Sequence, residues 1–148
     1  MRRWLFKSEP GEYSIDALAQ DRRDWWTGVR NYQARNFMRD MRPGDGALFY
    51  HSSCAEPGVY GAAKVSAAAA PDPTQFDPQS EYYDPKATPA APRWFCAQIE
   101  FVKKFARPLL LSAIRQIPEL AEMHILRRGS RLSITPVTAA EWRVIAGR

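Results

Sequence analysis

The chain has 148 residues, and this length fits one domain, residues 1–148, with a substantial hydrophobic core. Hydrophobic residues make up 45% and charged residues 25%, which predicts a globular protein, and no apolar run is long enough to span a membrane. The net charge is +5, and residues 101–148 hold nine Lys and Arg against three Asp and Glu. This basic excess suits a polyanionic partner but is equally compatible with an ordinary basic protein.

Signals for metal binding and for secretion are weak. Cys54 and Cys96 do not have the spacing of a zinc site, and the chain has only two histidines to add to them. Only three apolar residues separate Arg3 from Lys7, so the N-terminus lacks the pattern of a signal peptide. We therefore expect reduced thiols in a cytoplasmic protein that binds no metal and no cofactor.

The first half of the chain predicts short strands that alternate with helices. Residues 4–6 are an apolar run flanked by charge and predict a buried strand. Ser14 is a typical N-cap for a short helix, because its hydroxyl can accept a hydrogen bond from the first turn. A second helix is expected over residues 33–42. Residues 46–52 and 58–67 then predict two more strands.

A proline-rich segment, residues 67–92, is expected to be a long loop. Pro71, Pro73 and Pro78 lie close together, and a dense Tyr-Tyr-Asp-Pro-Lys cluster occupies residues 82–86. Loops of this length without secondary structure of their own are usually functional or mobile. We expect residues 71–92 to form a mobile flap whose end, residues 82–86, folds back over a binding pocket.

The last third of the chain predicts two strands and two helices. Residues 94–105 alternate well enough for a long strand. Residues 108–117 place apolar side chains at helical spacing after a proline. Residues 132–137 predict a final strand, and Thr138 with Glu141 forms a capping-box pattern for a C-terminal helix. Together these elements predict an α+β fold, a compact mixed β-barrel with peripheral helices.

The most informative stretch is residues 25–36, which combines three aromatic rings, two arginines and three side-chain amides. Rings stack on flat ligands, and amides read hydrogen-bonding edges. Gly28 permits a backbone turn that a side chain would hinder. Because Trp25 and Trp26 are adjacent, we expect Trp25 to enter the core and Trp26 to face a pocket. The alternative is that both rings belong to the core and the amides are helix caps.

Patterns for catalysis are poor. Residues 43–46 are rich in glycine but join a helix to a strand, which is the reverse of the order in a P-loop. His51 lies beside Ser52 on a predicted strand, and adjacent strand residues point to opposite faces. A non-catalytic protein is the leading interpretation. The open alternatives are an enzyme on a nucleotide or modified base, with His51 or Glu9 as general base, and a binder of a small anionic metabolite.

Binding chemistry is richer, because aromatic rings, planar cations and small polar groups together suit an unstacked nucleobase. The motifs that carry these groups closely resemble the EVE domain family, and they span nearly the whole chain. They are residues 4–10 (WLFKSEP), 26–36 (WTGVRNYQARN), 44–45 (GD), 50–52 (YHS), 58–61 (GVYG), 83–86 (YDPK), 93–95 (RWF) and 130–133 (SRLS).

The resemblance implies a PUA-like fold related to YTH domains, and a function as a reader of a modified nucleobase. Modified cytosine in DNA is the favoured ligand, and RNA is the alternative. We also expect a monomer that has no membrane partner. By their place in the YTH pattern, Lys7, Ser8 and Trp26 belong to the pocket. Chemistry and motif position add Asn31, Tyr32, Gln33, His51, Ser52, Tyr83, Trp94, Arg131 and Ser133, with Arg30 and Arg35 as phosphate contacts.

Overall fold

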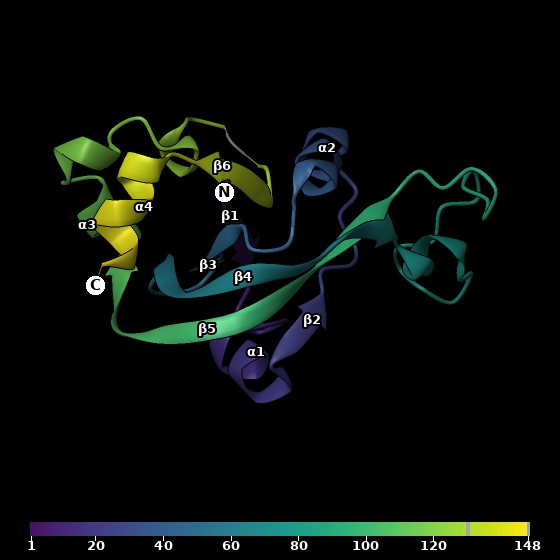
Figure 1. Ribbon diagram of the computed structural model, residues 1–148, viewed down its shortest axis with the longest axis horizontal. Helices are drawn as coiled ribbons and strands as arrows, with labels where there is room; N and C mark the ends of the chain where they lie inside the picture. Colours follow the sequence, from purple (N-terminus) through teal and green to yellow (C-terminus); the bar gives the residue numbers. More distant parts are fainter. Residues whose placement is uncertain (130, 148) are drawn as a thin grey trace.

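The computed structural model describes residues 1–129 and 131–147, whose strands form one strongly curved six-stranded sheet (Figure 1). Ser130, which opens the last family motif, and Arg148 lie outside the described residues. The strands are β1 (Arg3–Ser8), β2 (Arg23–Trp25), β3 (Gly46–His51), β4 (Gly58–Pro71), β5 (Phe95–Leu110) and β6 (Ile134–Val137). The α-helices are α1 (Ile15–Asp21), α2 (Tyr32–Asp40), α3 (Leu111–Ile114) and α4 (Ala139–Ala146). Short 3-10 helices occupy Pro73–Phe76, Pro118–Leu120 and His124–Leu126.

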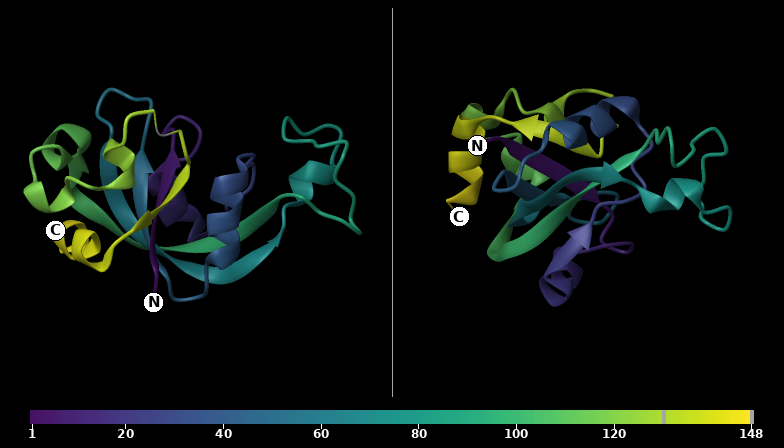
Figure 2. Two further views of the ribbon diagram at one scale, coloured as in Figure 1. Left: turned by 90° about the horizontal axis from the view of Figure 1, so that it is seen from above. Right: turned by 45° about the vertical axis from the view of Figure 1, so that its right-hand side comes forward.

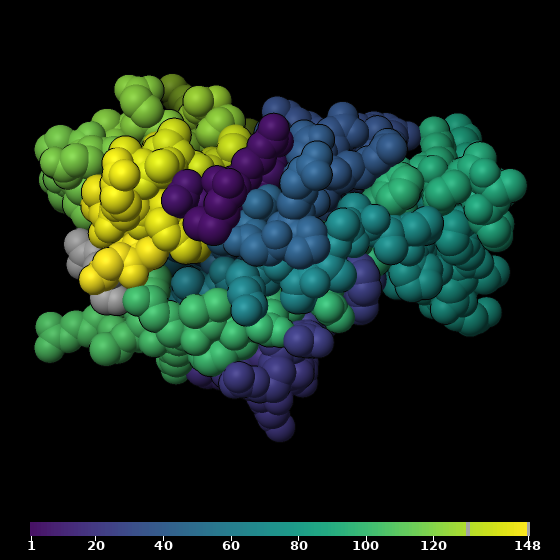
Figure 3. Space-filling model, in the orientation of Figure 1, coloured from purple at the N-terminus to yellow at the C-terminus, as the bar shows by residue number. Residues whose placement is uncertain are grey.

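The sheet is mixed, with the order β2-β5-β4-β3-β1-β6. β1 pairs in parallel with β3 and antiparallel with β6, which brings the N-terminal strand beside the C-terminal segment (Figure 3). Trp4 and Phe6 belong to one buried apolar cluster, and Leu5 belongs to another. β1 is therefore buried on both faces, which explains its continuous apolar run. The predicted α+β class, with a mixed barrel-like sheet and peripheral helices, is confirmed.

Local capping interactions open α1, α2 and α4; those of α1 and α4 are as predicted, and that of α2 matches the alternative in which the amides of residues 25–36 are helix caps. The Ser14 side chain accepts a hydrogen bond from the Ala17 amide at 3.1 Å and opens α1. Asn31 caps α2 by the same geometry, and Thr138 and Glu141 form the reciprocal capping box of α4. Among the described residues, no helix combines the length and apolar character that crossing a membrane requires.

Two predicted boundaries are wrong, and the pairing of β4 with β5 explains both. β4 continues to Pro71, beyond the predicted loop start at Ala67, because Pro71 and Ala70 lie opposite residues at the start of β5. β5 continues to Leu110, opposite Gly58, so residues 108–110 are extended and α3 spans only Leu111–Ile114. A long antiparallel ladder therefore overrides the local proline and helix signals. β2, which was not predicted, pairs with β5 at the sheet edge.

Between β4 and β5 the chain leaves the sheet as residues 72–94, which project from one end of the molecule (Figure 2). Buried Gln75 ties the two ends of this excursion together. Its amide nitrogen donates to the carbonyl oxygens of Asp72 and Trp94, and its amide oxygen accepts from the Arg93 and Trp94 backbone amides. The excursion therefore has an internal framework of buried hydrogen bonds.

Candidate functional site

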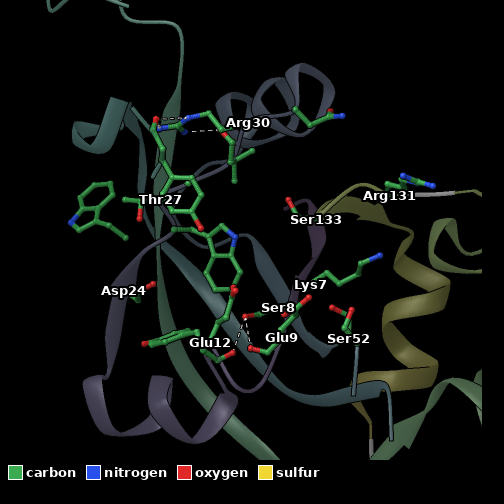
Figure 4. Close-up of a pocket in the computed structure, with 18 residues that line it drawn as sticks. Lys7, Ser8, Glu9, Glu12, Asp24, Thr27, Arg30, Ser52, Arg131 and Ser133 are labelled. Carbon is green, nitrogen blue, oxygen red and sulfur yellow. Dashed lines mark hydrogen bonds between the residues drawn. The ribbon is translucent and has the colours of Figure 1, made fainter. Parts of the chain in front are cut away.

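An open cavity of about 630 Å³ lies where the C-terminal ends of β1 and β3 meet the turn between β2 and α2 (Figure 4). Backbone hydrogen bonds hold its segments in register. The Lys7 amide donates to the Ser133 carbonyl at 2.8 Å, and the Ser52 amide donates to the Ser8 carbonyl at 2.9 Å. Parallel pairing of β1 and β3 thus places Ser8 and Ser52 at the cavity, and the hydrogen bond from Lys7 places Ser133 there.

Trp26 lines this cavity and is also part of the core. Its ring is 9% exposed and meets Phe6, Phe49 and Tyr13 edge to face at centroid distances of 5.2, 5.7 and 6.2 Å. Trp25 also lines the cavity but is 40% exposed. The expectation that Trp25 enters the core is therefore wrong. Trp25 ends the edge strand β2, where alternation along the backbone turns Trp26 inward.

The turn before α2 is held by a cluster that we call the Arg30 clasp, formed by Gly28, Arg30, Asp72, Thr74 and Tyr82. Asp72 is fully buried and accepts from the Gly28 amide at 2.8 Å and from the Arg30 guanidinium at 3.1 Å. Arg30 also donates to the Thr74 hydroxyl and twice, at 3.1 and 2.7 Å, to the Tyr82 carbonyl oxygen.

The clasp keeps Asp72 ionised. Burial alone would raise the pKa of this carboxyl, but hydrogen bonds from Thr74, Gly28 and Arg30 outweigh it and hold the pKa below its ordinary value. The sequence assigns Arg30 to a phosphate contact; in the structure the residue lines the cavity, but its guanidinium donates to Asp72, Thr74 and Tyr82 within the clasp. It instead fixes the excursion so that Tyr82 forms a wall of the cavity.

Charge is divided between two sides of the cavity. Lys7 and Arg131 lie on one side, and Asp24 and Glu12 lie on the other (Figure 4). Burial, followed by repulsion from Asp21, raises the pKa of Asp24. This arrangement therefore matches a ligand that has hydrogen-bond donors at one end and negative charge at the other.

The cavity brings together eight of the site residues expected from the sequence, which are Lys7, Ser8, Trp26, Arg30, Asn31, Ser52, Arg131 and Ser133. The Asn31 side-chain oxygen is occupied as the cap of α2, so its amide nitrogen is the group left for other contacts. Gln33 lies outside the cavity, in a neighbouring hollow that also contacts Asn31 and Arg131.

His51 does not belong to this site. Its ring stacks on Tyr60 at a centroid distance of 4.0 Å, and its Nε2 accepts a hydrogen bond from the Ile15 amide at 3.1 Å. Burial lowers the pKa of His51, with a smaller lowering from Lys104 and an opposing effect of Asp16. Ser52, the next residue, lies at the cavity instead, as expected for neighbours at the end of a strand.

Three expected aromatic residues also lie elsewhere. Tyr32 stacks on Trp94 at 4.7 Å, and the Trp94 indole nitrogen donates to the Asp84 carboxylate at 2.8 Å. Tyr83 is 42% exposed and does not line the cavity. Arg35, expected at a phosphate, lies over the Tyr32 ring and donates to the Arg93 carbonyl oxygen. These contacts belong to the packing of the excursion against α2.

The aromatic wall of the cavity is Tyr82, which the predicted site omitted in favour of Tyr83. The end of the predicted flap, residues 82–86, reaches the cavity through the ring of Tyr82 and not through that of Tyr83. No local signal separates two adjacent tyrosines in a loop, because the choice depends on the Arg30 clasp. The acidic side, Asp24 and Glu12, was also missed, because capping and turn roles explain isolated carboxylates equally well.

Comparison with known proteins places these features in a wider group. The EVE domain family model matches residues 2–148. Human thymocyte nuclear protein 1 is 39% identical over 158 residues, an alignment that covers 94% of this chain and 70% of the relative. An X-ray crystal structure of a Pseudomonas putida protein has a TM-score of 0.94 at 49% identity and covers 98% of this chain and 97% of its own. The crystal structure of human THYN1 protein in complex with 5-methylcytosine-containing DNA has a TM-score of 0.93 at 36% identity, covering 99% and 96%.

Proposed function

Because this chain belongs to the EVE domain family, we propose that it is a non-catalytic reader of DNA that holds a modified cytosine, such as 5-methylcytosine, in the cavity beside Trp26. The observation that carries the proposal is the lining of that cavity, which combines aromatic rings, small polar groups and both basic and acidic side chains. The human relative crystallised with 5-methylcytosine-containing DNA supports the choice of base.

The cavity offers a physical route to base recognition. A volume of about 630 Å³ lies within the usual range for small-ligand sites, roughly 300–1,000 Å³. A cytosine turned out of the duplex enters beside the rings of Trp25, Trp26 and Tyr82, which replace the stacking that it loses. Stacking alone does not choose a base, so discrimination falls to the polar lining.

The division of charge gives the base an orientation. Cytosine presents its exocyclic N4 amine as a donor, and carboxylates are its typical acceptors. Asp24 and Glu12 are therefore placed to accept from this amine, while Lys7 and Arg131 face the negatively charged backbone. The Ser8 hydroxyl already donates to the Tyr13 carbonyl at 2.8 Å, so it meets the base as an acceptor.

Binding to duplexes with one 5-methylcytosine, compared with the same duplex carrying cytosine, tests the proposal by fluorescence anisotropy. We expect tighter binding of the modified duplex. Tyr82→Ala should weaken that binding about tenfold, because a stacked aromatic ring contributes about 1–3 kcal/mol. Tyr83→Ala is the matched control and should bind as the wild type does. Equal affinity of the wild type for both duplexes would refute a modified-base reader.

A further inference from the structure

A second, shallower hollow of about 420 Å³ adjoins the cavity, and Asn31 and Arg131 line both. We call it the arginine hollow. Its remaining lining residues are Gln33, His124, Arg127, Arg128, Gly129 and Leu132. The lining of the hollow therefore contains three arginines and no carboxylate, whereas the lining of the cavity includes Glu9, Glu12 and Asp24.

The arginines of the hollow are available to a ligand. Arg127, Arg128 and Arg131 are exposed, and within residues 1–129 and 131–147 none of them forms an ion pair. Gly129, at φ 75°, turns the backbone in the left-handed region between Arg128 and Arg131. Three like charges held close together repel one another, and an anion between them removes that repulsion.

We propose that the arginine hollow binds the phosphodiester backbone of the DNA strand next to the base held in the cavity, an inference that rests on the proposed function. Guanidinium groups present planar, forked donors that match phosphate oxygens. Arg131 belongs to both surfaces, so a strand that leaves the cavity over Arg131 reaches Arg127 and Arg128 next. Asp24 and Glu12 lie on the side of the cavity away from Arg131 (Figure 4), and their carboxylates repel phosphate.

The salt dependence of DNA binding tests this assignment. Each phosphate neutralised on duplex DNA adds about −0.9 to the slope of log affinity against log salt concentration. The double variant Arg127→Gln/Arg128→Gln should therefore reduce the magnitude of the slope by about 1 to 2. The control Arg107→Gln/Arg115→Gln removes the same net charge from exposed arginines outside both surfaces, and should leave the slope unchanged.

Neutral methylphosphonate linkages locate the contact on the strand. We expect a methylphosphonate on one flank of the modified base to weaken DNA binding by the wild type but not by the Arg127→Gln/Arg128→Gln variant. The neutral linkage and the double substitution each remove the same interaction, so their effects do not add. Additive losses on both flanks would overturn the inference. So would a slope in the double variant equal to that of the wild type or of the control.

The two proposals fail in distinguishable ways. If the wild type binds modified and unmodified duplexes equally, the proposed base reader is wrong, yet the slopes of the two double variants still decide the arginine hollow. If the wild type discriminates between the duplexes and the slopes do not differ, only the hollow is wrong. Absence of binding to either duplex overturns both.

Discussion

The ring of Tyr82 lies against the backbone of Gly28, so closely that a Cβ on Gly28 would approach the Tyr82 Cζ to 2.8 Å. Gly28 also has a φ of +84°, a conformation that residues with a side chain rarely adopt. Glycine at this position therefore serves both the turn that leads to α2 and the placement of the aromatic wall. The Arg30 clasp holds the two segments in this contact.

Gly28→Ala should lower the free energy of unfolding and displace the Tyr82 ring. Strain from the positive φ costs about 1–3 kcal/mol, and the steric conflict adds to it. Gly44→Ala is the matched control, because Gly44 has a φ of +96° but open space where its Cβ would lie. Urea unfolding and DNA titration measure both effects. Gly44→Ala should lower stability without weakening DNA binding. Equal losses of DNA binding in the two variants would argue against Tyr82 as the aromatic wall of the cavity.

Trp26→Ala should lower the free energy of unfolding by about 3–5 kcal/mol, because it removes a buried ring packed on three other rings. Trp25→Ala should cost less than about 1 kcal/mol, since this residue is 40% exposed, and should still weaken DNA binding. Thermal melts and titrations of both variants distinguish the two roles. A Trp25→Ala protein as unstable as Trp26→Ala would contradict the placement of these rings.

Acid should destabilise the protein in part through Asp72. Its pKa in the folded protein lies below the unfolded value of about 3.9, so its stabilisation is complete above that pH and is lost as the pH falls further. Asp72→Asn should lower the free energy of unfolding by about 1.5–3 kcal/mol at pH 7, the contribution of a hydrogen bond to a charged group, and should reduce the further loss of stability at acid pH. Asp77→Asn, on the exposed side of the same excursion, should leave the loss of stability at acid pH as it is in the wild type. Urea unfolding from pH 7 to pH 3 measures the difference.

His51 should make stability depend on pH in a higher range. Burial lowers its folded pKa below the unfolded value of about 6.5, so the stabilisation present above that pH is lost as the pH falls below it. His124 has a pKa shift in the same direction, so His51→Gln should flatten the slope below pH 6.5 only in part. DNA binding at pH 7 should stay unchanged, because His51 lies outside the cavity. Loss of DNA binding in a folded His51→Gln protein would contradict the placement of His51 outside the binding site.

Short-range signals in the sequence determined α1 and α4 and their caps. Ser14, Asn31 and the Thr138–Glu141 pair each act on backbone groups three residues away, so their capping roles depend on local sequence alone. The buried first strand and the α+β class follow equally from local pattern. The family motifs located Lys7, Ser8 and Trp26, which the structure places at one cavity.

Only the tertiary structure decided which side chains meet at the site. Arg30 is a candidate phosphate ligand by composition, but it pairs instead with the buried Asp72, which is distant in sequence. The same clasp selects Tyr82 over Tyr83, and the edge strand β2 selects Trp26 over Trp25 for the interior. These choices depend on contacts between segments far apart in the chain, whose energies no local pattern contains. The sequence alone therefore determined most of the elements and the kind of chemistry, whereas the pairing of distant strands and charges determined β2, the ends of β4 and β5, and which residues meet at the site.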